Sequence, residues 1–87
     1  MEEMYQECID KWGVQFQLLM LQEECAELIQ ASVHYIRNRD NKTCHLLEEI
    51  VDVELLIGQV KRILNSPDQY KNIRARKIKR LKSRLFK

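Results

Sequence analysis

Carboxylates occur in two dense groups inside the most apolar parts of the chain. The stretch EECAE begins at Glu23, and the stretch EEIVD ends at Asp52. Because residues three or four apart share one face of an α-helix, Glu24 and Glu27 point in one direction, and Glu49 does the same with Asp52. Each pair falls on a stripe whose other members are largely apolar. Both stripes are therefore predicted to be packing faces with acids at their centres.

Acids in such positions suit metal binding. Four carboxylates brought into a low-dielectric interior cost several kcal/mol per ion unless something neutralises them. Mg²⁺ and Mn²⁺ prefer carboxylate oxygen, and two pairs on facing helices supply ligands from rigid elements. The alternative is a solvated face, since Glu is a good helix former. The recurrence of the pattern on a second apolar-flanked stripe favours the metal interpretation.

Four helices are predicted to position these acids. Gly13 is suited to ending the first helix in the αL conformation, and the turn-forming run NRDNKT separates the second from the third, with Thr43 as the expected N-cap. Ser66 or Pro67 is expected to open the last helix. The predicted ranges are about 2–11, 14–38, 44–64 and 68–86.

The composition predicts a single all-α domain over residues 1–87. Hydrophobic residues make up 45% of the chain, which has only two glycines and one proline. We expect a short antiparallel bundle of about four helices. The second and third helices are apolar on two sides, so one side of each is expected to meet another subunit, in a homodimer or a dimer of dimers.

Charge is distributed unevenly although the net charge is only +2. Residues 67–87 carry nine Lys or Arg against one acid, whereas residues 1–27 carry seven acids against one Lys. Such asymmetry can mark an anionic partner, but no base-reading motif accompanies it, so nucleic acid is not expected as a partner. The acidic start, the absence of a long apolar run and the odd number of cysteines predict a soluble cytoplasmic protein without membrane contact.

The acidic motifs resemble those of a known family. The pattern EExxE followed by ExxD, beginning at Glu23 and Glu49, is similar to the signature of MazG-type all-α nucleoside triphosphate pyrophosphohydrolases. The flanking text EECAELIQA and LLEEIVDVELLIGQVKRIL, and the tail KIKRLKSRL, resemble compact single-domain members, often encoded by phages or prophages. The resemblance covers about residues 12–87 and implies the MazG-like helical fold.

The resemblance also implies a reaction and roles for the acids. These enzymes cleave a nucleoside triphosphate between its α and β phosphates with Mg²⁺, for which Mn²⁺ could substitute. Glu24, Glu27, Glu49 and Asp52 would be the metal ligands, and Glu23 would be either a second-shell group or the base that orients water. The pathway stays open among nucleotide-pool house-cleaning, a dUTP-directed activity and depletion of an alarmone.

The basic tail offers candidates for phosphate binding. Lys77 lies on the predicted inward stripe of the last helix with Ile73 and Leu81, and it matches a lysine that tails of the family carry. Arg80 is a weaker candidate, because a solvated basic helix commonly explains such a run. The alternative function is a non-catalytic helical oligomer that binds nucleic acid or a protein partner through this tail.

Candidates for base recognition lie at the start of the second helix. Trp12 could stack on a nucleobase and Gln17 could read its edge, although an aromatic residue in this position is more often part of a core. His34 lies seven residues beyond Glu27, the end of the first acidic motif, and His45 lies four residues, about one turn, before Glu49 of the second. Either histidine could touch a ligand, but we assign neither of them to the site.

Overall fold

This computed structural model describes residues 1–38 and 43–86, and nearly all of these residues lie in α-helices. Four helices follow in chain order: α1 Glu2–Trp12, α2 Val14–Asn38, α3 Thr43–Leu64 and α4 Pro67–Leu85. The predicted all-α class is confirmed, and the four predicted ranges agree with these bounds to within one residue. None of the described helices is long and apolar enough to cross a membrane.

The helix ends follow local sequence signals. Gly13 ends α1 with φ 89° and ψ 160°, a conformation that glycine enters at little cost; the ψ value differs from the αL geometry that was predicted. Thr43 was predicted to be the N-cap of α3, but it is the first residue of this helix. The predicted turn before it falls largely on 39–42, outside the described residues. Ser66 is the N-cap of α4 and Pro67 its first residue, as predicted.

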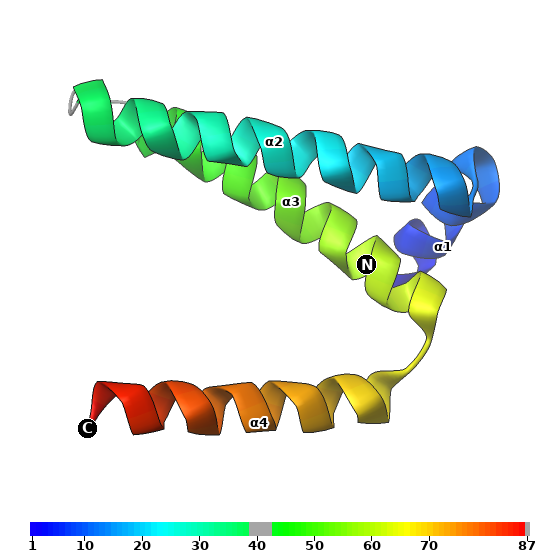
Figure 1. The fold of residues 1–87 in the computed structure, drawn as a ribbon. Coiled ribbons are helices and arrows are strands. Elements are labelled where there is room, and N and C mark those ends of the chain that lie inside the picture. Colours follow the sequence, from blue (N-terminus) through cyan, green and yellow to red (C-terminus); the bar gives the residue numbers. More distant parts are fainter. Residues whose placement is uncertain (39–42, 87) are drawn as a thin grey trace.

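The α2 and α3 helices form an antiparallel pair, which is the main packing unit (Figure 1). Few side chains are buried between the two helices. The buried apolar side chains among the described residues are Ala31, Val53 and Leu56, and two glutamines, Gln17 and Gln59, are buried with them. The pair is therefore a two-layer arrangement with a polar element in its core.

The short α1 helix fills the open end of this pair. Tyr5 packs so closely on Gly58 that a Cβ atom at Gly58 would lie 2.6 Å from the Tyr5 ring. Arg62 of α3 adds polar contacts, 2.9 Å from Glu2 and 2.7 Å from Gln6. The missing side chain at Gly58 is therefore what lets α1 approach α3.

The α4 helix runs back along the molecule without packing on the other helices over its length (Figure 1). At its start, Lys61 Nζ lies 3.9 Å from the centroid of the Tyr70 ring. Farther along, Leu81 and Leu85 are 63% and 71% exposed. The radius of gyration is 15.9 Å, whereas a compact chain of this length has one of about 12 Å. The described helices thus form a three-helix unit with an extended fourth arm.

Candidate metal centre

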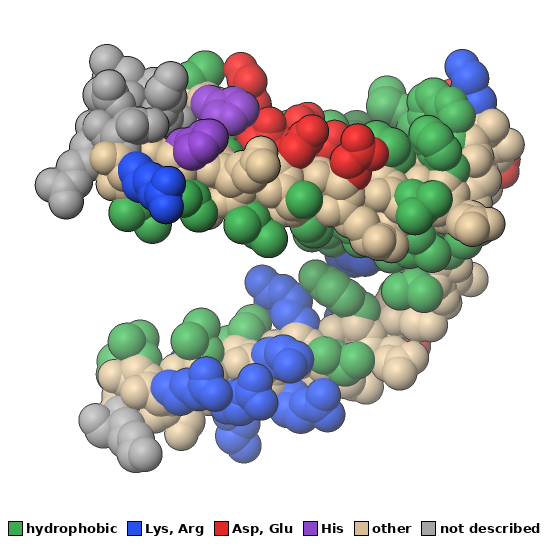
Figure 2. Space-filling view, turned by 45° about the horizontal axis from the view of Figure 1, so that its top comes forward, with side chains coloured by type: hydrophobic (Ala, Val, Ile, Leu, Met, Phe, Trp, Pro, Cys, Tyr) green, Lys and Arg blue, Asp and Glu red, His purple; other side chains and the backbone are tan. Residues whose placement is uncertain are grey.

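Three carboxylates from two helices converge midway along the α2 and α3 pair. Glu24 of α2 and the α3 residues Glu49 and Asp52 each place one oxygen so that these oxygens lie within 4.8 Å of one another. Acidic side chains form a row over these two helices in Figure 2. The antiparallel pairing brings the middle of α2 beside the first half of α3, so the two predicted acidic stripes do face each other. We call these three residues the carboxylate trio.

Two oxygens of the trio have no hydrogen-bond partner. Glu24 Oε2 and Glu49 Oε2 are buried side-chain atoms without one, and a buried polar atom in this condition destabilises a fold. A divalent cation would supply the missing partner. Oxygens on one Mg²⁺ lie about 2.9 Å apart when they are adjacent and about 4.2 Å apart when they are opposite, so oxygens within 4.8 Å of one another can reach a shared ion by side-chain adjustment. The residues therefore fit a hard divalent cation.

The electrostatics of the trio also indicate a site in need of positive charge. The pKa of Glu24 is raised from 4.5 to about 7. A hydrogen bond shared with Glu27 contributes most, burial comes next, and repulsion from Glu27, Asp52 and Glu49 adds to both. Each of these effects favours a proton on Glu24 where no cation is bound. A bound cation would reverse that preference and expel the proton.

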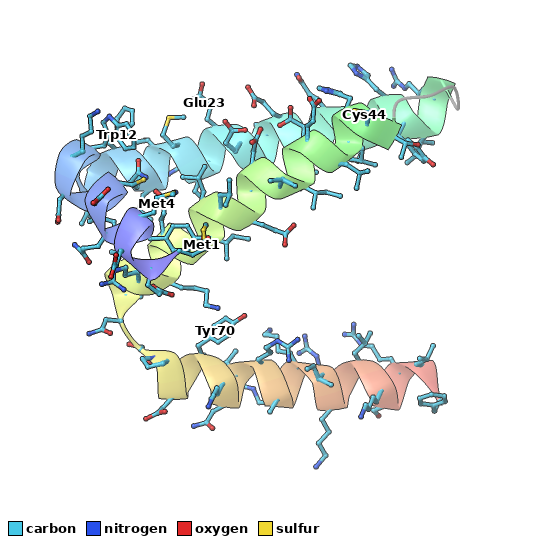
Figure 3. All side chains as sticks on the ribbon, turned by 180° about the vertical axis from the view of Figure 1, so that it is seen from behind. Met1, Met4, Trp12, Glu23, Cys44 and Tyr70 are labelled. Atoms are coloured by element: carbon cyan, nitrogen blue, oxygen red, sulfur yellow. The ribbon has the colours of Figure 1, made fainter. Side chains whose placement is uncertain are left out.

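The two other predicted acids lie beside the trio. Glu27 is exposed, interacts with Glu24, and lines a hollow of about 220 Å³ together with Glu49. Glu23 is also exposed, and Figure 3 shows it pointing outward from α2. The structure thus brings three of the four predicted ligands together, puts the fourth at their edge and leaves Glu23 outside the group.

A second hollow lies next to the trio, toward the α1 end of α2. It has a volume of about 350 Å³ and contains both residues that were predicted to contact a base, Trp12 and Gln17. Trp12 is 49% exposed, and Figure 3 shows it at the turn between α1 and α2. The full lining is Trp12, Phe16, Gln17, Met20, Leu56 and Gln59.

Sequence reasoning missed Gln59 as part of this hollow. The side-chain amide of Gln17 donates a hydrogen bond to the side-chain oxygen of Gln59. The side-chain nitrogen of Gln59 donates in turn to the Leu55 carbonyl at 3.3 Å. Gln59 lies seven residues after Asp52, on the same face of α3, so the helical period contains the signal. The amide pair presents fixed polar groups in a mostly apolar hollow, which suits recognition of a base edge.

The predicted phosphate-binding residues are not brought to the trio within one chain. Lys77 and Arg80 are exposed on α4, which lies apart from the acidic row (Figures 1 and 2). Their stripe is uncovered as well, since Ile73 is 38% and Leu81 63% exposed. If these cations reach a phosphate at the trio, they must come from another copy or from a different placement of α4.

Comparison of the chain with known proteins does not assign it to a family. No protein-family model matches the chain, and no curated protein or solved structure is significantly similar to it. The MazG-like resemblance stays a prediction that depends on the acidic motifs and their flanking residues. The convergence of the carboxylates and the two hollows beside them are the structural basis for a functional proposal.

Proposed function

We propose that this protein is a Mg²⁺-dependent nucleoside triphosphate pyrophosphohydrolase that releases a nucleoside monophosphate and pyrophosphate. The observation that carries the proposal is the carboxylate trio, in which two buried oxygens lack partners. These oxygens come from two packed helices and lie within 4.8 Å of one another, which supports a cation site held by rigid elements. The resemblance to MazG-type enzymes supplies the reaction, and nucleotide-pool house-cleaning is the role that we propose with it.

The two hollows suggest how the substrate lies. The nucleobase would stack on Trp12 and meet the amides of Gln17 and Gln59, while the triphosphate extends along α2 to the trio. Bound Mg²⁺ would offset phosphate charge and acidify a water molecule. Glu27, exposed at the edge of the trio, would orient that water and accept its proton, and Glu23 is the alternative.

An oligomer is part of the proposal. The chain exposes 7482 Å², whereas a compact protein of 10.5 kDa exposes about 5,400 Å². The excess includes apolar side chains on the outer face of the helical pair, such as Ile29 and Ile36, which are 64% and 71% exposed. A homodimer, or a dimer of dimers, would cover this surface and could bring Lys77 and Arg80 of one copy to the trio of another.

The test is an assay of products from a panel of canonical, deoxy and modified nucleoside triphosphates, with Mg²⁺, with Mn²⁺ and with chelator. We expect monophosphate and pyrophosphate from at least one substrate, with no product in chelator. Release of diphosphate and inorganic phosphate would contradict cleavage between the α and β phosphates. Silence across the panel in folded protein would contradict the proposal as a whole.

A second candidate function rests on α4. The helix is exposed along its length and gathers basic side chains on the face seen in Figure 2, so a non-catalytic oligomer could bind nucleic acid or a protein partner through it. Binding to nucleic acid would weaken with salt, by a log-log slope of about −0.7 to −0.9 per phosphate contact. A gel-shift salt series with that slope, joined to a silent hydrolysis panel, would favour this candidate.

A further inference from the structure

A third hollow lies at the corner where α3 turns into α4, with α1 along its other side. It has a volume of about 580 Å³, and its lining includes three bases, Lys61, Arg62 and Lys71, against one acid, Glu2. No residue of the carboxylate trio or of the Trp12 hollow lines it. We call this space the corner hollow. It is separate from both parts of the site described above.

The lining of the corner hollow favours an oxyanion. Besides the three bases, it contains the hydroxyl groups of Tyr5, Ser66 and Tyr70 and the side-chain amide of Asn65. All of these groups can donate hydrogen bonds, and lysine and arginine form their strongest ones with carboxylate or phosphate oxygens. Figure 3 shows Tyr70 at the start of α4, on the side that faces the other helices.

The bases of the corner hollow keep most of their charge available. Arg62 pairs with Glu2 at 2.9 Å, but the Glu2 side chain is 72% exposed, so solvent screens this pair. Lys61 lies over the Tyr70 ring, a contact that leaves its charge in place. Within residues 1–38 and 43–86, neither Lys61 nor Lys71 forms a salt bridge. The hollow is therefore positively charged on balance.

Local contacts hold the corner in shape. Asn65 has φ 47°, a left-handed conformation that asparagine tolerates better than most residues. Its backbone N–H donates to the Lys61 carbonyl at 3.0 Å, and that of Tyr70 donates to the Ser66 carbonyl at 2.9 Å. On the other side, the contact of Tyr5 with Gly58 fixes α1. These donors are thus positioned without help from the exposed remainder of α4.

We propose that the corner hollow binds a small phosphate-bearing anion, with Lys61, Arg62 and Lys71 as its charged contacts. Its volume falls within the range of about 300 to 1,000 Å³ that is usual for small-molecule sites. Inorganic phosphate, pyrophosphate and a nucleotide share the required chemistry. The site goes beyond the proposed hydrolysis and does not depend on it.

The experiment is an NMR titration of the ¹⁵N-labelled full chain with inorganic phosphate, pyrophosphate and adenosine monophosphate. Chelator is present throughout, so that no cation can bridge the trio to a phosphate. We expect saturable shifts of the amide signals of Asn65 and Ser66, whereas those of Glu24 and Asp52 should stay in place. The ligand that binds most tightly identifies the source of the phosphate group.

Two variants and a control test the assigned bases. A hydrogen bond to a charged group is strong enough that Lys61→Ala and Lys71→Ala should each weaken binding by at least about tenfold. Lys79→Ala removes the same charge from an exposed part of α4 and should bind like the wild type. The spectrum of each variant shows whether it remains folded.

Three results would overturn the inference. They are the absence of saturable shifts with all three anions, full binding by either Lys61→Ala or Lys71→Ala, and a loss in Lys79→Ala as large as theirs. The last result would mean that the basic helix attracts anions without a defined site. The proposed hydrolysis is measured separately with Mg²⁺ and would survive each of them, because the trio takes no part in this binding.

Discussion

Glu24 is the residue at which the needs of folding and of function conflict most. One of its oxygens is buried without a partner, and its pKa is raised to about 7 by Glu27, by burial and by the neighbouring acids. A leucine in this place would strengthen the α2 and α3 interface. Positions that break the rules of core packing in this manner are commonly functional ones.

Removing one charge from the trio should stabilise the metal-free protein. In Asp52→Asn, repulsion of Glu24 is relieved while the side chain keeps its size, so we expect a higher melting temperature without metal. The wild type should gain about 2.7 kcal/mol when Mg²⁺ is at a hundred times its Kd, and the variant should gain far less. Calorimetry of both, beside the exposed control Glu54→Gln, makes the comparison. Equal Mg²⁺ stabilisation in all three would contradict the assigned ligands.

The raised pKa of Glu24 makes both stability and metal binding depend on pH. Its folded pKa of about 7 lies above its ordinary value of 4.5, so between these values the folded state holds more protons than the unfolded state. The stability of the metal-free protein should therefore fall as pH rises through this window. Mg²⁺ must displace the proton, so its affinity should drop about tenfold per pH unit below 7. Titration calorimetry at several pH values measures this slope, and Glu24→Gln should remove it.

At the scale of the elements, the sequence predicted the helices well because their ends carry strong local signals. Gly13 and Pro67 mark two of them, and the helical period placed Glu24 opposite Asp52 on facing stripes. The axial register between α2 and α3 could not be predicted, because it depends on how the whole side-chain surfaces of the two helices fit together. This register puts Glu27 at the edge of the trio and brings Gln59 to Gln17.

The contact between Tyr5 and Gly58 should control the docking of α1. In Gly58→Ala the new methyl group would lie 2.6 Å from the ring, and overpacking of this kind costs about 1 to 3 kcal/mol. Alanine also favours the helix over glycine by up to about 1 kcal/mol. We therefore expect the free energy of unfolding, measured by chemical denaturation, to fall by roughly 1 kcal/mol. In a Tyr5→Ala background the same change should stabilise. Equal effects of Gly58→Ala in both backgrounds would show that contact with the Tyr5 ring is not the cause of the destabilisation.

The whole molecule has more surface than a chain of its size needs. The apolar outer face of the helical pair and the uncovered stripe of α4 are both exposed. The large radius of gyration reflects α4, which extends away from the other three helices. The position of α4 was the least predictable part of the fold, because one chain offers few partners for its apolar stripe. Lys77 was predicted to lie on an inward stripe of this helix, but Ile73 and Leu81 of the same stripe are exposed within one chain.

A change on the apolar outer face should act on assembly rather than on the fold of one chain. Ile29 is 64% exposed, so Ile29→Glu costs a single chain little, but it would bury a charge in the proposed subunit interface. We expect the dimer of this variant to dissociate at least about tenfold more readily in sedimentation equilibrium. Gln22→Glu, an exposed change on the same helix, is the control. A wild-type chain that is monomeric at high concentration would contradict the proposed oligomer.

The central claim is that the carboxylate trio holds the cation that drives hydrolysis of a nucleoside triphosphate. Its most direct test is the rate of pyrophosphate release in Mg²⁺ by the wild type, by Glu24→Gln and by the control Glu54→Gln, each with the substrate that the panel favours. We predict that Glu24→Gln is slower by at least about a hundredfold and that Glu54→Gln matches the wild type. A wild-type rate from folded Glu24→Gln protein would contradict the claim.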